Sequence, residues 1–406
     1  MYRPLDVDTV IDYVRSHPRA KDHLDTTGEL EAVEVGDGNL NLVFKVFDRS
    51  SNRSLLIKQA LPYVRVAGPS WPMPAERAGF EARALDVEHR CAPGLVPEPY
   101  WFDEQLMLNA MENLVDHRVI RFPMMEAKRY RDLGVTIGDF LARTLYATSD
   151  FALDAAEKRS MMRGFFNVEL CRITEDLVFT EPYLRDAPRN RWNPRIDADV
   201  ADFQADEELK AEAAKLKYRF MTSAEALIHG DLHTGSIMAN DHDIRVIDPE
   251  FAFFGPMGFD VGAFIGNLFL SGASHEIHSP DPDARRAYRR YLLDEAIATW
   301  TTFEAGFRQR LTDVSSPSWS SVGFQEAFIA SVLRDTAGFA GAKMLRRIVG
   351  FAHVADLDSI EDLDDRARAE RIAIRIGRTL VRQHGKVGSF DDVVAIAAAQ
   401  LEVRDG

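Results

Sequence analysis

Two short apolar runs, each followed at once by polar residues that include carboxylates, constrain this chain more than any other feature. The first run, residues 226–228, leads into His229-Gly230-Asp231-Leu232-His233, and the second, residues 244–247, leads into Asp248-Pro249-Glu250-Phe251. Short apolar runs that end in polar loops are typical of buried strands. Side chains two positions apart lie on the same side of an extended chain, so we expect residues 248 and 250 to face one way.

The three carboxylates of these loops match the needs of phosphoryl transfer. That reaction needs one carboxylate to orient the acceptor hydroxyl and others to hold magnesium against the phosphates. Asp231 suits the first role and Asp248 with Glu250 the second, because Mg2+ takes oxygen ligands and usually binds one or two carboxylates plus substrate phosphates. Each residue alone could instead be a turn cap or a solvated carboxylate, but the ordered pair of motifs favours a catalytic site.

The composition limits the classes of protein to which this chain can belong. With 406 residues, 46% of them hydrophobic, the chain can form two or three packing units. Its 49 basic and 64 acidic residues give a net charge of -15, and no dense basic patch occurs, which argues against nucleic acid as a partner. The cysteines, Cys91 and Cys171, stand in no cluster, so a disulfide framework or structural zinc is not expected. A charged N-terminus and the lack of any run of membrane-spanning length predict a cytoplasmic protein with no membrane segment.

The first third of the chain predicts an antiparallel sheet. We expect a helix over residues 7–14 and five strands, over residues 31–35, 40–47, 54–60, 97–102 and 105–111. The first two strands flank the glycine-rich tip Gly36-Asp37-Gly38-Asn39. Its backbone N–H groups could approach phosphate oxygens, with Asn41 as a further donor, although a plain turn is the commoner explanation of such a tip by itself.

Two charged residues and one strand end of this region fit a nucleotide site. Lys58 stands about twenty residues after the glycine-rich tip, which is the spacing of the kinase lysine that contacts nucleotide phosphates. Glu81, or else Glu76, on a helix expected over residues 75–90 could pair with it. The fifth strand runs into Glu112-Asn113-Leu114, the position of a kinase hinge, where backbone groups bind adenine.

Beyond residue 130 the apolar spacing is helical. We expect loops at residues 180–194, 271–282 and 312–319, and helices over residues 134–148, 155–179, 199–220, 261–270, 283–310, 323–349, 360–384 and 391–403. Asp260 could cap the helix over residues 261–270. The chain is therefore predicted to be an α+β protein with a sheet domain over residues 1–114 and a mainly helical domain over residues 115–406.

Arg346 and Arg347 stand near the end of one predicted helix. Adjacent helical side chains point about 100 degrees apart, so the two need not share a target. A solvated basic pair at a helix end is the default interpretation. Arginines can also hold a phosphate or sugar through paired donors.

Together these motifs resemble the aminoglycoside phosphotransferase and choline kinase-like superfamily, which is related to protein kinases. Within it the chain most resembles the 5-methylthioribose kinase family. The similar segments run from residue 35 to about residue 360 and comprise residues 35–44, 59–65, 229–236, 248–251, 255–260, 346–347 and 353–356.

The resemblance implies a bilobal protein-kinase-like fold and a reaction. The reaction would transfer the γ-phosphoryl group of ATP to the 1-hydroxyl of 5-methylthio-D-ribose, in methionine salvage, with Mg2+ and in a homodimer. Asp231 would orient the 1-hydroxyl, and whether it also removes the proton stays open. Asp248 and Glu250 would hold magnesium.

The resemblance also implies contacts for the remaining residues. The nucleotide would be bound by Gly36, Asp37, Gly38, Asn39, Asn41, Lys58, Glu81, Glu112, Asn113, Leu114, Asp248, Pro249 and Glu250. The sugar and the developing phosphate would contact His233, Arg346 and Arg347. Ser236 stands where many members of the superfamily carry an Asn that binds a second metal, so the number of metal ions stays open.

Two other functions stay open from the residues alone. One is a kinase of the same fold that acts on another small alcohol, such as an amino alcohol or an aminoglycoside. A cationic substrate would favour an acceptor pocket rich in carboxylates, which Arg346 and Arg347 oppose. The other is a catalytically inactive nucleotide-binding regulator, although the lysine, the base and the metal ligands are all present. Trp71, Met257 and Phe259 could line an apolar pocket for a thioether, but such residues are as often part of the core.

Overall fold

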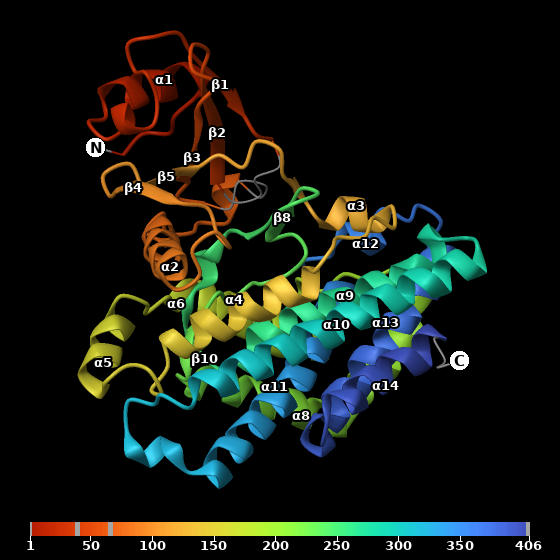
Figure 1. The fold of residues 1–406 in the computed structure, drawn as a ribbon. Helices are drawn as coiled ribbons and strands as arrows, with labels where there is room; N and C mark the ends of the chain where they lie inside the picture. The colour runs from red at the N-terminus through yellow and green to blue at the C-terminus, as the bar shows by residue number, and fades with distance from the viewer. Residues whose placement is uncertain (1, 37–40, 64–67, 403–406) are drawn as a thin grey trace. The chain divides into compact units, whose positions relative to one another are not determined.

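The computed structural model describes residues 2–36, 41–63 and 68–402, and it forms two compact units (Figure 1). The first unit comprises Met1–His117 and Arg245–Ala252, and the second comprises Arg118–Ile244 and Phe253–Gly406. We predicted a division after residue 114 with the metal site in the second domain. The structure instead groups the segment that carries Asp248 and Glu250 with the sheet unit.

The first unit contains a five-stranded antiparallel sheet in the order β1-β2-β3-β5-β4. Its strands are β1 (Leu30–Glu34), β2 (Asn41–Asp48), β3 (Ser54–Ala60), β4 (Pro99–Asp103) and β5 (Leu108–Glu112). Alternate residues of β2 and β3 are fully buried on one face, where α1 (Val7–Ser16) packs. Lys58 follows the buried Ile57 and therefore points to the other face. There α2 (Arg77–Cys91) packs against β3, β4, β5 and the 3-10 turn η5 (Pro249–Phe251).

The second unit is mainly helical (Figure 1). Its helices are α3 (Arg121–Met125), α4 (Leu133–Ala147), α5 (Ala155–Arg163), α6 (Val168–Phe179), α7 (Asp197–Ala205), α8 (Glu207–Thr222), α9 (Gly258–His278), α10 (Pro282–Arg310), α11 (Val322–Val349), α12 (Ala355–Asp358), α13 (Leu363–Gln383) and α14 (Phe390–Leu401). The buried helix α9 packs against α10, α11 and α13. Within the described residues, none of these helices is both long and apolar enough to cross a membrane.

Short strands frame the first carboxylate loop. β7 (Ala226–Ile228) pairs with β10 (Phe253–Gly255), and β8 (Ile237–Ala239) pairs with β6 (Arg118–Val119). β9 (Ile244–Val246) spans the boundary between the two units. The loop that contains Asp231 therefore leaves β7, where the first apolar run predicted a strand, and enters β8, which was not predicted.

Three helix predictions were wrong. The single helix expected over residues 155–179 is divided into α5 and α6, because α5 ends at its cap residue Gly164. Residues 271–282 were expected to form a loop because they are polar, but α9 continues to His278. Ser274 and His275 are buried and have internal partners, since Ser274 Oγ donates to the carbonyl of Ser271 and His275 Nε2 lies 2.9 Å from the carbonyl oxygen of Met124. Burial therefore overrides the polar pattern. The helix expected over residues 199–220 is broken at Asp206, whose side chain accepts from the N–H of Leu209 and caps α8.

Glycines bring α9 and α11 unusually close together. Gly258, Gly262 and Gly266 recur at four-residue intervals along α9. A Cβ added at Gly262 would lie 2.5 Å from the carbonyl oxygen of Thr336 and 2.8 Å from the nitrogen of Ala340, both on α11. Since both atoms belong to the backbone, α11 has to shift to accommodate even a methyl group.

We predict that Gly262→Ala lowers the free energy of unfolding by about 1–3 kcal/mol, because the clash outweighs the gain in helix propensity. Gly323→Ala is the matched control, since Gly323 is also helical but an added Cβ there meets no atom within 4 Å. That variant should gain about 0.5–1 kcal/mol. Urea unfolding followed by circular dichroism measures both values, and equal effects would contradict the close approach.

Candidate active site

Lys58 is the centre of the nucleotide-binding candidates in the first unit. Its Nζ lies 2.7 Å from Glu81 Oε1, and both side chains are buried. Lys58 also forms a close ion pair with Asp248. The expected pair with Glu81 is thus formed, in preference to Glu76. Burial alone would lower the pKa of Lys58, but the charges of Asp248 and Glu81 raise it above its usual value, so the side chain is an ammonium.

A second buried network lies in the same unit. Asn41 Nδ2 donates to Glu250 Oε2 at 3.2 Å, and Arg77 Nη2 donates to Asn41 Oδ1 at 2.8 Å. Arg77 Nε lies 3.7 Å from Glu250 Oε2. The amide of Asn41, expected to be a donor toward phosphates, is therefore engaged within the protein. The sequence reasoning missed Arg77, because nothing separates it from an ordinary surface arginine at the start of a helix.

The backbone around Asp248 differs from the extended chain that we expected. Asp248 has φ of +66° in the left-handed region, and Pro249–Phe251 forms the 3-10 turn η5. The argument that residues 248 and 250 face one side of a strand is therefore wrong. Asp248 keeps 47% of its side chain exposed, whereas Glu250 is buried beside Arg77.

Asp248 fits a magnesium ligand better than Glu250 does. Its half-exposed carboxylate can accept an ion from solvent, while Glu250 Oε2 already accepts from Asn41. No three His, Cys, Asp or Glu side chains converge within the parts of the chain that the structure describes. This donor set suits Mg2+, which commonly takes few protein ligands and completes its shell with phosphates and water.

The remaining nucleotide-binding candidates lie at the end of β5, in the glycine-rich tip and in η5. Glu112 ends β5, where its Oε2 accepts from Arg245 at 3.3 Å, and the side chain of Asn113 donates to Ser54 at 3.0 Å. Leu114 is buried. The side chains of Glu112 and Asn113 contact the protein itself, and adenine recognition by the backbone of this segment stays a prediction. Of the glycine-rich tip the structure describes Gly36, while Asp37, Gly38 and Asn39 lie outside the described residues. Pro249 is the first residue of η5.

Asp231 is the centre of the acceptor candidates in the second unit. Lys343 Nζ donates to Asp231 Oδ1 at 2.6 Å, and His233 Nε2 lies 3.2 Å from Asp231 Oδ2. The hydroxyl of Ser236 donates to the carbonyl of Asp231 at 2.9 Å. Burial would raise the pKa of Asp231, but the charge of Lys343 and then the interaction with His233 lower it well below its usual range, so Asp231 is a carboxylate at neutral pH.

Asp260 holds the loop of Asp231 in place. It is buried and accepts from the N–H of His229 at 2.6 Å and of Gly230 at 3.0 Å. Gly230 has φ of +83°, a conformation that favours glycine. The expectation that Asp260 caps its own helix was wrong, since α9 begins without a side-chain cap. The carboxylate instead satisfies two buried donors of the loop of Asp231, residues 229–236, which is the candidate catalytic loop.

The basic residues of α11 are buried, so the interpretation of Arg346 and Arg347 as a solvated pair was wrong. Their relative exposures are 9% and 8%. Arg347 Nη1 donates to the carbonyl of Ala352 at 3.1 Å, and Arg346 Nε is buried with no hydrogen-bond partner among the described residues. Lys343 precedes them by three and four positions and therefore shares their side of the helix. That spacing was the available signal for Lys343, which the sequence reasoning missed.

Arg121 is a further cation of this unit that the sequence reasoning missed. Its Nε donates to Thr234 Oγ1 at 3.2 Å and lies 3.2 Å from Asp356 Oδ2, and its Nη2 donates to Asn267 Oδ1 at 3.2 Å. Thr234 belongs to the loop of Asp231, so Arg121 ties that loop to α9 and to the segment after α11. No apolar pattern marked this arginine.

The apolar candidates for a thioether pocket have different environments. Met257 and Phe259 are fully buried in the core of the second unit, and Phe259 packs against Phe179, Phe220 and Phe339. Trp71 is partly exposed in the first unit. For Met257 and Phe259 the core interpretation is therefore correct.

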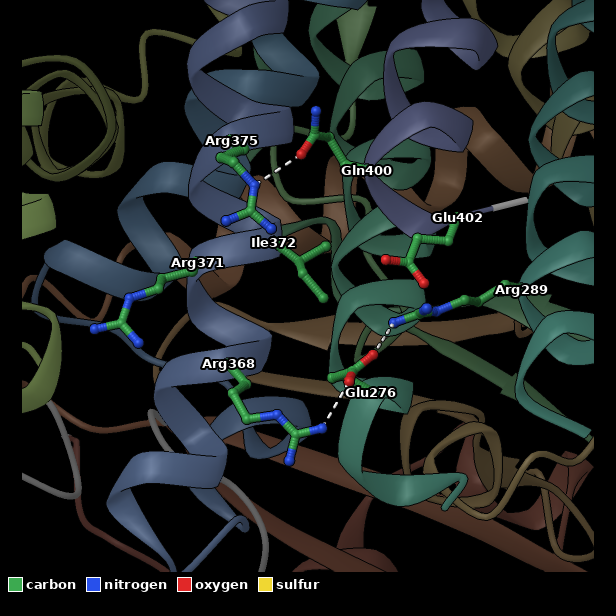
Figure 2. Close-up of a pocket in the computed structure, with 8 residues that line it drawn as sticks. All are labelled: Glu276, Arg289, Arg368, Arg371, Ile372, Arg375, Gln400 and Glu402. Carbon is green, nitrogen blue, oxygen red and sulfur yellow. Dashed lines mark hydrogen bonds and ion pairs between the residues drawn. The ribbon is translucent and has the colours of Figure 1, made fainter. Parts of the chain in front are cut away.

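A separate pocket lies between α9, α10, α13 and α14 (Figure 2). Its lining residues are Glu276, Arg289, Arg368, Arg371, Ile372, Arg375, Gln400 and Glu402. Figure 2 shows Arg289 and Arg368 paired with Glu276, and Arg375 bonded to Gln400. Because these arginines already have partners within the protein, we assign this pocket no ligand.

Comparison with known proteins identifies the family of this chain. Residues 31–302 match the phosphotransferase enzyme family. The chain is 43% identical to a methylthioribose kinase of Geobacillus thermodenitrificans over 360 residues, which cover 88% of each chain. It is 41% identical to a methylthioribose kinase of Escherichia coli O45:K1 over 413 residues, covering 98% of this chain and 97% of the other. The chain belongs to the methylthioribose kinase family. This membership confirms the predicted family and kinase-like α+β fold, and makes the chain a small-molecule kinase.

We predict that Asp260→Ala impairs this member of the methylthioribose kinase family through its catalytic loop. The change leaves the N–H groups of His229 and Gly230 buried without an acceptor, at about 1–3 kcal/mol each, and frees the backbone next to Asp231. Both the unfolding free energy and kcat should fall.

Asp281→Ala is the matched control for Asp260→Ala. Asp281 caps α10 by accepting from the N–H of Ala284, so its removal should lower stability by about 1 kcal/mol without a change in kcat. If Asp260→Ala retained the wild-type kcat, the assigned role of Asp260 would be incorrect.

Proposed function

We propose that this chain transfers the γ-phosphoryl group of ATP to the 1-hydroxyl of 5-methylthioribose. The bond from the γ-phosphorus to the β-γ bridging oxygen breaks and a bond from the sugar oxygen to that phosphorus forms. The hydroxyl proton leaves by way of Asp231, and ADP and 5-methylthioribose 1-phosphate are released.

The observation that carries this proposal is the environment of Asp231. The carboxylate is ionised, and each of its oxygens accepts from one fixed donor, Lys343 on one side and His233 on the other. A carboxylate oxygen has more than one acceptor site, so a substrate hydroxyl can still donate to it. This arrangement suits the task of orienting a hydroxyl for attack on phosphorus.

The charge of the acceptor site supports a neutral substrate. Lys343, Arg346 and Arg347 are all buried on one helix beside Asp231, and the charge of Asp231 acts on each of them. Such a site opposes a second positive charge, which disfavours an amino alcohol or an aminoglycoside. The unsatisfied Nε of Arg346 suits a sugar hydroxyl or the developing phosphate. The names of the relatives then favour methylthioribose among neutral sugars.

The nucleotide-binding residues would supply positive charge and a metal site for the phosphates of ATP. Lys58, kept charged by Glu81 and Asp248, would contact the phosphates of ATP. Asp248, with Glu250 as a second ligand, would hold Mg2+, which when bound neutralises part of the phosphate charge.

We propose one tightly held metal ion rather than two. Ser236, which stands at the position of the second-metal Asn, donates to the carbonyl of Asp231 and accepts from the N–H of His233. Its hydroxyl therefore supports the loop. Assembly as a homodimer, a cytoplasmic location and a place in methionine salvage stay predictions that rest on the family resemblance.

We predict that Asp231→Ala lowers kcat by about 10²–10⁴-fold, because the group that orients the acceptor is lost. Since Lys58 and Asp248 are unchanged, the affinity for ATP should stay close to that of the wild type. A coupled ADP assay and calorimetric titration with an ATP analogue measure the two quantities. Asp241→Ala, which removes an exposed carboxylate ten positions further along, should keep wild-type turnover. Wild-type turnover in Asp231→Ala would show that another group orients the acceptor.

We predict that methylthioribose gives the highest kcat/KM in an ATP-consumption assay against methylthioribose, ribose, choline and homoserine. Choline should be the poorest acceptor, because its fixed positive charge meets the three buried cations of α11. A clear preference for any of the other three alcohols would overturn the proposed substrate.

A further inference from the structure

Lys343 is a buried cation in direct contact with the acceptor carboxylate, although it lies 112 positions away from Asp231 in the sequence. Its side chain is only 2% exposed, and its Nζ lies 2.6 Å from Asp231 Oδ1. The ring of Phe259 lies on another side, with its centroid 4.9 Å from Nζ. A lysine packed between a carboxylate and an aromatic face has little freedom to move, so the contact has a defined geometry.

The second oxygen of Asp231 has a donor of a different kind. The N–H of Gly235 donates to His233 Nδ1 at 2.9 Å, so Nδ1 is an acceptor and the hydrogen of the ring lies on Nε2. Nε2 therefore donates to Asp231 Oδ2 at 3.2 Å. Burial lowers the pKa of His233 to about 3 against the effect of Asp231, so the ring is neutral at physiological pH. The positive charge in contact with Asp231 thus comes from Lys343.

The two arginines of α11 do not duplicate this contact. Among the described residues the carboxylate of Asp231 has a hydrogen bond or ion pair with Lys343 and His233, while Arg347 donates to the carbonyl of Ala352. The arginines act on Asp231 only through their charge. In the part of the chain that the structure describes, only Lys343 both fixes the direction of the carboxylate and compensates its charge.

We propose that Lys343 is a positioning residue for phosphoryl transfer, which reaches the catalytic loop from α11 and holds Asp231 as an oriented carboxylate. The proposal rests on the proposed function in one respect, since it takes Asp231 as the group that orients the acceptor hydroxyl. It does not depend on which alcohol is the acceptor. A carboxylate paired with an ammonium is a weak base, so Asp231 orients the hydroxyl first and receives its proton late, as a loose transition state requires.

The charge of Lys343 should be visible in the pH dependence. The groups that face it are Asp231 and His233 of the catalytic loop, Asp260 of α9, and Arg346 and Arg347 of its own helix. Burial, opposed by Asp231 and reinforced by the two arginines, lowers the pKa of Lys343 to about 8. The ammonium is therefore present below about pH 8 and lost above it. Since kcat/KM reports the free enzyme, it should fall as the pH rises through 8.

The test compares Lys343→Met, which keeps the length of the side chain but removes the charge, with Lys343→Arg, which keeps the charge at all accessible pH values. Lys158→Met is the control, because Lys158 is also buried in this unit but binds Asp150 and the carbonyls of Ala224 and Glu225. Turnover and kcat/KM are measured from pH 6 to 10 with whichever alcohol of the acceptor panel is phosphorylated fastest. A preference for an alcohol other than methylthioribose would thus refute the substrate without affecting this test.

Lys343→Met should lower kcat by about 10–100-fold with the KM for ATP unchanged, and should lose the decline near pH 8. Lys343→Arg should recover most of the activity and also lose that decline. Lys158→Met should keep the wild-type profile even if it is less stable. Wild-type kcat and an unchanged decline in Lys343→Met would overturn the proposal. If Lys343→Met does not fold, the pH profile of Lys343→Arg decides the matter. A decline of kcat/KM that stays at pH 8 in Lys343→Arg would overturn the proposal, whereas loss of that decline or its movement to higher pH would support the proposal.

Discussion

The close approach of α9 and α11 is the constraint on which the acceptor site depends. Each helix supplies one part of the support for the catalytic loop. Asp260 on α9 accepts from the loop backbone, and Lys343 on α11 donates to the side chain of Asp231. Glycines on α9 let the backbones meet at Thr336 and Ala340, and Ala340 lies less than a helical turn before Lys343. A wider spacing between the helices would leave the loop held by only one of them.

The buried ion pairs of both units are better explained by chemistry than by stability. Two unit charges 4 Å apart attract by about 4 kcal/mol at an effective dielectric constant of about 20. Removing each ion from water costs several kcal/mol, so such a pair adds little net stability. The pairs of Lys58 with Glu81 and of Lys343 with Asp231 nevertheless occur beside the residues that the chemistry needs. Buried groups with perturbed pKa values are typical of functional sites, and both pairs fit that pattern.

Sequence reasoning succeeded where a local pattern decides the structure. The strand over residues 54–60, whose apolar residues precede Lys58, was predicted with its observed bounds. It failed where packing overrides the pattern. The polar residues after Leu270 continue a helix because they find buried partners, and Asp248 adopts a left-handed conformation that an alternating pattern cannot reveal. Asn41 was expected to face a ligand, but Arg77 and Glu250, which bind it, lie 36 and 209 positions away.

The sequence by itself determined the family, the antiparallel sheet and the identity of the acidic residues at the candidate site. It could do so because motifs and periodicity are local, and each requires only neighbours within a few positions. The tertiary structure alone decided which cations meet those acids. Arg77 and Arg121 carry no local signature, Lys343 has only its spacing from Arg346 and Arg347, and the partners of all three lie far away in the chain. Their roles follow from burial, because a charge removed from water must find a partner wherever the packing of helices and strands places one.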